Sequence, residues 1–167
     1  MKKRIICFYL FLSISLLVNA FIIVEGFIGG GDSAKQSFSI SELFIEFVKL
    51  FAPNSKIVTD PETTHYVIRK LVGHFGLFGL SGLFTTLTFV FIEDAFEKRM
   101  YDIIFVSLAV GISIAFFSEL AQVFTPGRYM SFIDMLIDYA GYVGFGGLTF
   151  LFSYLTYKKK QKKDIKE

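Results

Sequence analysis

The sequence contains little cysteine and little charge, and each shortage excludes classes of protein. Cys7 is the only cysteine among 167 residues, so an intramolecular disulfide framework and a CxxC metal or redox motif are both excluded. Charged residues make up 19% of the chain, below the share of about a quarter that is typical of soluble domains. The net charge of +2 is too small to indicate nucleic acid as a partner. No period of 20–50 residues indicates a repeat protein.

The sequence is rich in long apolar segments. Hydrophobic residues make up 53% of the chain, 22 residues are Phe, and the mean hydropathy is +0.57. Four apolar segments reach the roughly 20 residues that a helix needs to cross a bilayer: residues 5–24, 71–92, 103–124 and 132–157. We therefore predict an all-α membrane protein, a bundle of four transmembrane helices, with the lipid bilayer as its partner.

The first apolar segment also has features of a cleaved signal peptide. It follows three basic residues at positions 2–4, and the sequence VNA at residues 18–20 resembles a small-residue cleavage site. The apolar run continues past that site to Val24, which favours a helix that is retained.

Lys and Arg near the ends of spans set the orientation of a membrane protein. Here they gather at residues 2–4 and in the tail at residues 158–166. This predicts that both termini are cytoplasmic and that the loops at residues 25–70 and 125–131 face outward. The tail is expected to anchor the last helix to anionic lipid.

The long outer loop is expected to contain one helix. Residues 27–36 (FIGGGDSAKQ) are typical of a flexible chain, and residues 54–64 are typical of a loop with a turn at Asp60-Pro61. Residues 41–53 (SELFIEFVKLFAP) place Leu43, Phe44, Phe47, Val48 and Phe51 on one face, and Pro53 ends the pattern. This amphipathic helix lies either at the membrane surface or over the outer ends of the bundle. The chain then divides into residues 1–68, a core of three spans at residues 69–157, and a basic tail at residues 158–167.

Polar and charged residues, which are costly to place in lipid, lie at the outer ends of three different spans. Within each span they are three or four residues apart and so share a helix face, and His74, Glu119 and Asp138 lie roughly 6–10 Å below the span ends. A charge at mid-bilayer costs about 2.5–3.5 kcal/mol, so we expect three cations to neutralise three acids. The sequence predicts an outward-facing site made of Arg69, Lys70, His74, Glu119, Gln122, Arg128, Ser131, Asp134 and Asp138.

Simpler roles are open for several of these residues. Ser131-x-x-Asp134 is typical of a capping box at a helix start. Pro126-Gly127 is typical of a tight turn, and Lys70 has the length to snorkel to the interface. Small residues, among them Gly79, Gly82, Gly111, Gly141 and Gly144, predict close helix contacts.

The motifs around these positions resemble the VanZ-like family. They are RKLVGH at residues 69–74, ELAQ at 119–122, PGR at 126–128 and SFIDMLIDYAG at 131–141. The resemblance covers roughly residues 69–150. It departs from the family pattern at Asp138, which is often Asn there, and at Phe78, where Tyr is often expected. It implies a multi-span protein of the bacterial cell membrane, and the family's namesake is associated with low-level teicoplanin resistance.

Three functions are compatible with the predicted site. A binding protein would hold a lipid-linked cell-wall precursor or a lipoglycopeptide, with Arg128 on a phosphate or carboxylate. An enzyme that modifies a lipid headgroup or cell-wall precursor would use His74 and Glu119 as general base and acid. A purely structural network would fix the helix register. A transporter is disfavoured because the polar groups stop in the outer half of the bundle.

Cofactors are not indicated by the sequence. A divalent metal bridging Glu119, Asp134 and Asp138 suits the enzyme hypothesis. The chain has no spaced metal motif, however, so we predict no metal site.

Overall fold

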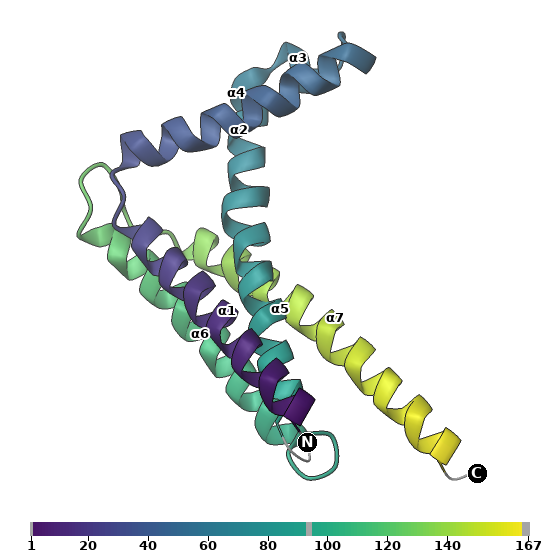
Figure 1. The fold of residues 1–167 in the computed structure, drawn as a ribbon. Helices are drawn as coiled ribbons and strands as arrows, with labels where there is room; N and C mark the ends of the chain where they lie inside the picture. The colour runs from purple at the N-terminus through teal and green to yellow at the C-terminus, as the bar shows by residue number, and fades with distance from the viewer. Residues whose placement is uncertain (1, 93–94, 165–167) are drawn as a thin grey trace.

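The computed structural model describes residues 2–92 and 95–164, and its elements over these residues are all helices (Figure 1). They are α1 (Lys2–Gly26), α2 (Gly30–Phe51), α3 (Lys56–Thr59), α4 (Pro61–Ile68), the π-helical segment η1 (Arg69–Gly76), α5 (Leu77–Val90), α6 (Met100–Val123) and α7 (Phe132–Asp164). Four helical stretches are long and apolar enough to cross a membrane: Lys2–Gly26, Pro61–Val90, Met100–Val123 and Phe132–Lys163. The predicted all-α, multi-pass architecture is confirmed at this level.

The bundle has the distribution of polar and apolar groups that suits lipid. Leu17 and Phe105 are 71% and 74% exposed, whereas Glu119 and Ser81 are fully buried. Polar side chains satisfy one another between helices, since Ser81 donates to the Asn19 side-chain oxygen at 2.5 Å. Because lipid offers no hydrogen bonds, such pairs help to hold helices together.

The first helix is an integral part of this bundle. α1 packs against both α5 and α6, and the hydroxyls of Ser15 and Thr85 are hydrogen-bonded at 2.8 Å. At its start, the Arg4 guanidinium donates to the carbonyls of Phe91 and Ile92 just after α5. These contacts join α1 to the bundle, and the retention of the segment stays a prediction.

Two glycines lie where α5 and its extension meet α7. A Cβ at Gly82 would lie 2.1 Å from the Tyr142 carbonyl oxygen, and one at Gly141 would lie 2.2 Å from the Phe75 carbonyl oxygen. The predicted close approach is therefore correct at these positions. It is wrong at Gly144, where a Cβ would meet nothing within 4 Å.

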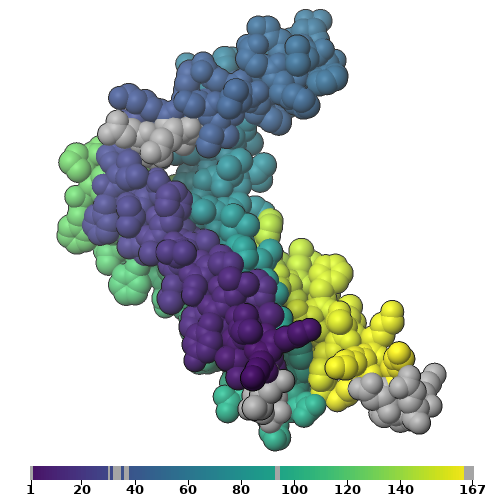
Figure 2. Space-filling view, in the orientation of Figure 1, coloured from purple at the N-terminus to yellow at the C-terminus, as the bar shows by residue number. Residues whose placement is uncertain are grey.

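Helices α2 to α4 form an arm across one end of the bundle, and Figures 1 and 2 show it standing off the other helices. We call this end, where Gly26, Arg69, Val123 and Phe132 lie, the α2 end. Both chain termini lie at the opposite end (Figure 1).

The arm corrects two expectations. Residues 30–36 are helical rather than irregular, because α2 begins at Gly30. Extending an existing helix adds one hydrogen bond per residue, so the amphipathic run carries the helix back through residues of low propensity. Residues 56–59 and 61–64 are also helical: the Asp60 side chain accepts from the Thr63 backbone N–H at 3.2 Å and Pro61 opens α4. Asp60-Pro61 thus starts a helix, as an N-cap followed by proline.

Most of the apolar face of α2 is exposed over the described residues. Leu43 is 75% exposed and Phe51 is 76% exposed, while α2 packs against α3, α4 and η1. The position of this helix at the membrane surface stays a prediction.

Candidate functional site

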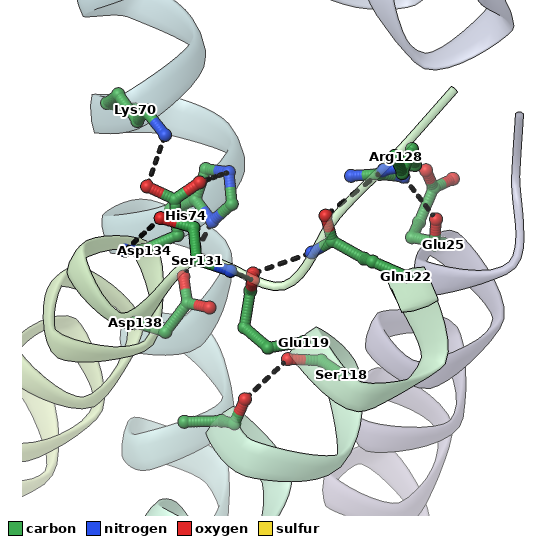
Figure 3. A network of polar contacts seen from close by, with 11 residues as sticks. Glu25, Lys70, His74, Ser118, Glu119, Gln122, Arg128, Ser131, Asp134 and Asp138 are labelled. Atoms are coloured by element: carbon green, nitrogen blue, oxygen red, sulfur yellow. Dashed lines mark hydrogen bonds and ion pairs between the residues drawn. The ribbon is translucent and has the colours of Figure 1, made fainter. Parts of the chain in front are cut away.

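The predicted site residues meet at the α2 end of the bundle. η1, α6, the turn after α6 and the start of α7 each contribute side chains, as Figure 3 shows. Eight of the nine predicted residues are joined by hydrogen bonds or ion pairs, and the ninth, Arg69, lines the same cavity.

The η1 segment carries three of these residues. It interrupts a continuous helix between α4 and α5 and includes two glycines, Gly73 and Gly76. Such π-helical turns are rare and are found frequently at functional sites. Here η1 places Lys70 and His74 against the start of α7.

Two acids of α7 receive these side chains. The Lys70 ammonium donates to the Asp134 carboxylate, and Asp134 Oδ2 lies 3.8 Å from His74 Nε2. His74 Nδ1 is hydrogen-bonded to Asp138 Oδ1 at 2.9 Å. Asp138 is 1% exposed, so this is a buried His–Asp pair. The interpretation of Lys70 as a residue that only snorkels is wrong, because its ammonium is held by Asp134.

The start of α7 is a capping box completed by another helix. The Asp134 backbone N–H donates to Ser131 Oγ at 3.2 Å, as the predicted capping box requires. The Ser131 backbone N–H, however, donates to Glu119 Oε2 at 2.8 Å. Glu119 of α6 therefore takes the place that a capping-box acid at Asp134 would fill, and the Asp134 carboxylate is left to bind Lys70.

Arg128 joins the site to the end of α1. Its Nε donates to Gln122 Oε1 at 3.2 Å, and its Nη1 donates to the carbonyls of Glu25 at 2.9 Å and Ile28 at 3.2 Å. Gln122 in turn donates to Glu119 Oε1 at 2.6 Å. Gln122 thus stands between Arg128 and Glu119, and among the described residues Arg128 forms no direct ion pair with an acid.

A tight turn gives Arg128 this position. The Arg128 backbone N–H donates to the Thr125 carbonyl at 3.2 Å, and Gly127 has a positive φ of 73°. Pro126 before a glycine of positive φ is the pattern of a type II turn, which confirms the predicted turn. The same segment is fixed to α1, since Thr125 Oγ1 donates to the Gly26 carbonyl at 3.0 Å.

A cavity of about 270 Å³ opens beside this network. Its polar lining residues are Glu25, Arg69, His74, Ser118, Glu119, Gln122, Arg128 and Asp138. Its apolar lining includes Phe21 of α1 and Val72 of η1, which are 52% and 48% exposed on the bundle surface. The cavity therefore has a polar side and a side that reaches the lipid-facing surface.

Two guanidinium groups face this cavity. Over the described part of the chain, Arg69 makes no hydrogen bond and no ion pair, yet it lines the cavity together with Arg128. Burial lowers the pKa of the Arg128 guanidinium, and the charge of Arg69 lowers this pKa further. The cavity is also lined by the acids Glu25, Glu119 and Asp138, so an anion would bind at the end where the two guanidinium groups lie.

Three residues of the network also have the chemistry of metal ligands. His74, Glu119 and Asp134 each offer one ligand atom, and these atoms lie within 4.8 Å of one another.

Sequence reasoning missed contributions from α1 and α2. The carbonyls of Glu25 and Ile28 bind Arg128, and Ile40 of α2 lines the cavity. Residue types do not show which backbone carbonyls accept hydrogen bonds from a side chain. Ile40 precedes the amphipathic run, so the sequence held no signal for its role.

The chain was compared with family models, curated proteins and solved structures, and none of them matches. The function is therefore argued from the geometry of the site.

Proposed function

We propose that the protein binds the anionic headgroup of a lipid-linked ligand in the outer leaflet of the membrane. The observation on which this rests is the pair of guanidinium groups, Arg69 and Arg128, that line one cavity. Arg69 has no partner in the described residues, so an oxyanion in the cavity gives it one. Guanidinium groups bind phosphate and carboxylate by charge-assisted hydrogen bonds.

The shape of the cavity supports a lipid-linked ligand rather than a soluble anion. Phe21 and Val72 line the cavity and are also exposed on the surface of spanning helices. A headgroup can therefore lie near the arginines while its hydrocarbon chain stays in the bilayer. The exposed apolar face of α2, beside the same end, suits an interfacial position at headgroup level.

The outward orientation of the site follows from the distribution of charge. Residues 2–4 and the basic tail lie at the end opposite the α2 end (Figure 1). Because basic residues are retained on the cytoplasmic side, the α2 end faces outward in this proposal.

The first test is lipid binding by purified protein, with polyprenyl phosphate as probe and polyprenol as its uncharged match. We expect Arg69→Gln to weaken binding of the phosphate about tenfold or more, since a hydrogen bond to a charged group contributes about 1.5–3 kcal/mol. Arg69 binds no other group in the described part of the chain, so the variant should fold like the parent. Arg99→Gln, which removes an exposed arginine at the start of α6, is the matched control.

Equal binding of polyprenol and polyprenyl phosphate would contradict the proposal, as would parent-like affinity in Arg69→Gln. The lipid recovered from this assay also tests a second candidate function. The buried His74–Asp138 pair is an arrangement that orients a histidine as a general base, which favours headgroup chemistry. An altered headgroup after incubation with the parent, and an intact one after incubation with His74→Gln, would support the enzyme.

We further propose, from the resemblance to the VanZ-like family, that the protein confers low-level teicoplanin resistance on a bacterium. Teicoplanin carries an acyl chain and vancomycin does not, so a site in the outer leaflet can distinguish them. We expect the parent to raise the inhibitory concentration of teicoplanin alone, and Glu119→Gln at equal abundance to abolish the effect. Equal protection by both proteins, or unchanged susceptibility with the parent, would rule this role out.

A further inference from the structure

Three side chains that have metal-ligand atoms lie close together, and each comes from a different helix. His74 lies on η1, Glu119 on α6 and Asp134 on α7, and one ligand atom of each lies within 4.8 Å of the other two. Ligand atoms at about 2.0–2.2 Å from a tetrahedral cation lie roughly 3.3–3.6 Å apart. The three side chains would therefore have to move closer together to bind one ion.

The orientation of His74 is that of a metal ligand. Its Nδ1 is hydrogen-bonded to Asp138 Oδ1 at 2.9 Å, so a neutral ring that donates from Nδ1 keeps a free lone pair on Nε2. Nε2 is the nitrogen that faces Asp134, with Oδ2 at 3.8 Å. A carboxylate that fixes the ring through its other nitrogen is a recurrent feature of histidine metal sites.

An independent observation comes from the second oxygen of Asp138. Asp138 is 1% exposed, and among the described residues its buried Oδ2 has no hydrogen-bond donor. Buried acceptors without a partner are rare and costly. Figure 3 shows this carboxylate between His74 and Glu119, directed into the cluster. A water molecule bound to a cation among the three ligands would supply the missing donor.

The negative charge of the acids in this cluster also favours a bound cation. Glu119, Asp134 and Asp138 are three acids in one cluster, and over the described residues the only lysine or arginine in an ion pair with them is Lys70. Arg128 is hydrogen-bonded to Gln122 and to the end of α1 instead. If all three acids are ionised, two negative charges stay uncompensated at close range, which is the charge of a divalent cation.

From these observations we propose a binding site for a divalent transition-metal ion, Zn²⁺ or Mn²⁺, formed by His74, Glu119 and Asp134 and oriented by Asp138. One imidazole with two carboxylates suits such ions, whereas Mg²⁺ and Ca²⁺ prefer ligand sets made of oxygen alone. The site goes beyond the proposed binding of a lipid headgroup and does not depend on it.

In the experiment, ZnCl₂, MnCl₂ and MgCl₂ are each titrated into chelator-treated, full-length protein in detergent, and binding is measured by calorimetry. We expect one Zn²⁺ or Mn²⁺ site per chain, and an affinity at least tenfold lower in His74→Gln, Glu119→Gln and Asp134→Asn. Asp138→Asn should weaken binding about 10–100-fold, as is typical of residues that orient a metal ligand. His65→Gln removes the other histidine of the chain and Asp102→Asn removes an exposed acid at the far end of α6, and both should bind like the parent.

A second measurement uses the parent alone and therefore does not depend on variants that fold poorly. The melting temperature of the parent should rise with added Zn²⁺, because a ligand that binds only the folded state stabilises it. A parent that neither binds nor gains stability would overturn the proposal, and so would binding that is lost in His65→Gln but kept in His74→Gln. Metal binding without binding of polyprenyl phosphate would overturn the lipid proposal alone.

Discussion

Replacing Glu119 by alanine is expected to lower the free energy of unfolding by about 2–5 kcal/mol, because two donors lose their acceptor. Glu119 is fully buried and accepts from the Ser131 backbone N–H at 2.8 Å and from the Gln122 amide at 2.6 Å. Leaving a buried donor without a partner costs about 1–3 kcal/mol. The loss extends to the start of α7, which Ser131 caps.

Glu119→Gln separates this structural role from the functional one. Its side-chain oxygen still accepts from the Ser131 N–H and only the Gln122 amide loses its acceptor, so we expect a loss of about 1–3 kcal/mol, smaller than in Glu119→Ala. It removes the negative charge that the proposed cation site needs. Chemical denaturation in detergent micelles measures both variants against the parent. If the two variants lost equal stability, the capping role of Glu119 would be wrong.

Replacing Gly141 by alanine is the second change with a large expected effect. A Cβ there would lie 2.2 Å from the carbonyl oxygen of Phe75, a backbone atom that cannot rotate away. Helix α7 must move from η1, which also separates His74 from Asp138. Overpacking typically costs about 1–3 kcal/mol, and we expect a value at the upper end.

Gly144→Ala is the matched control for this change. Gly144 lies three residues along the same helix, is exposed, and has nothing within 4 Å of an added Cβ. Alanine favours a helix over glycine by about 1 kcal/mol, so this variant should be as stable as the parent or slightly more stable. Thermal unfolding and membrane abundance of the two variants give the comparison. A similar loss in both would contradict the close contact between η1 and α7.

The convergence of these polar residues was predictable from the sequence, and their pairing was not. Polar residues in apolar spans are costly, so Glu119, Asp134 and Asp138 had to meet partners near the same bundle end. Spacing alone does not say which partner each residue finds. The capping box is shared with Glu119, and Arg128 binds Gln122 and carbonyls rather than an acid.

The spans were predictable because an apolar segment of about 20 residues is typical of a transmembrane helix. The arm was predicted only in part. The period of residues 41–53 indicates a helix, but nothing in FIGGGDSAKQ indicates that α2 starts at Gly30. The π-helical form of η1, which packs against α7, was also not predicted from the sequence.

The order of the partners along the chain has a consequence for assembly. Lys70 and His74 precede Asp134 and Asp138 by 64 residues, and the carbonyls of Glu25 and Ile28 precede Arg128 by about a hundred. Glu119 reaches Ser131 across only 12 residues, within a single helical hairpin. In a chain made from its N-terminus, each costly group of the last two helices is synthesised after the group that neutralises it, or together with it. The acids of α7 therefore meet partners that are already made, whereas Lys70 is made before Asp134 and until then has to keep its ammonium at the membrane interface.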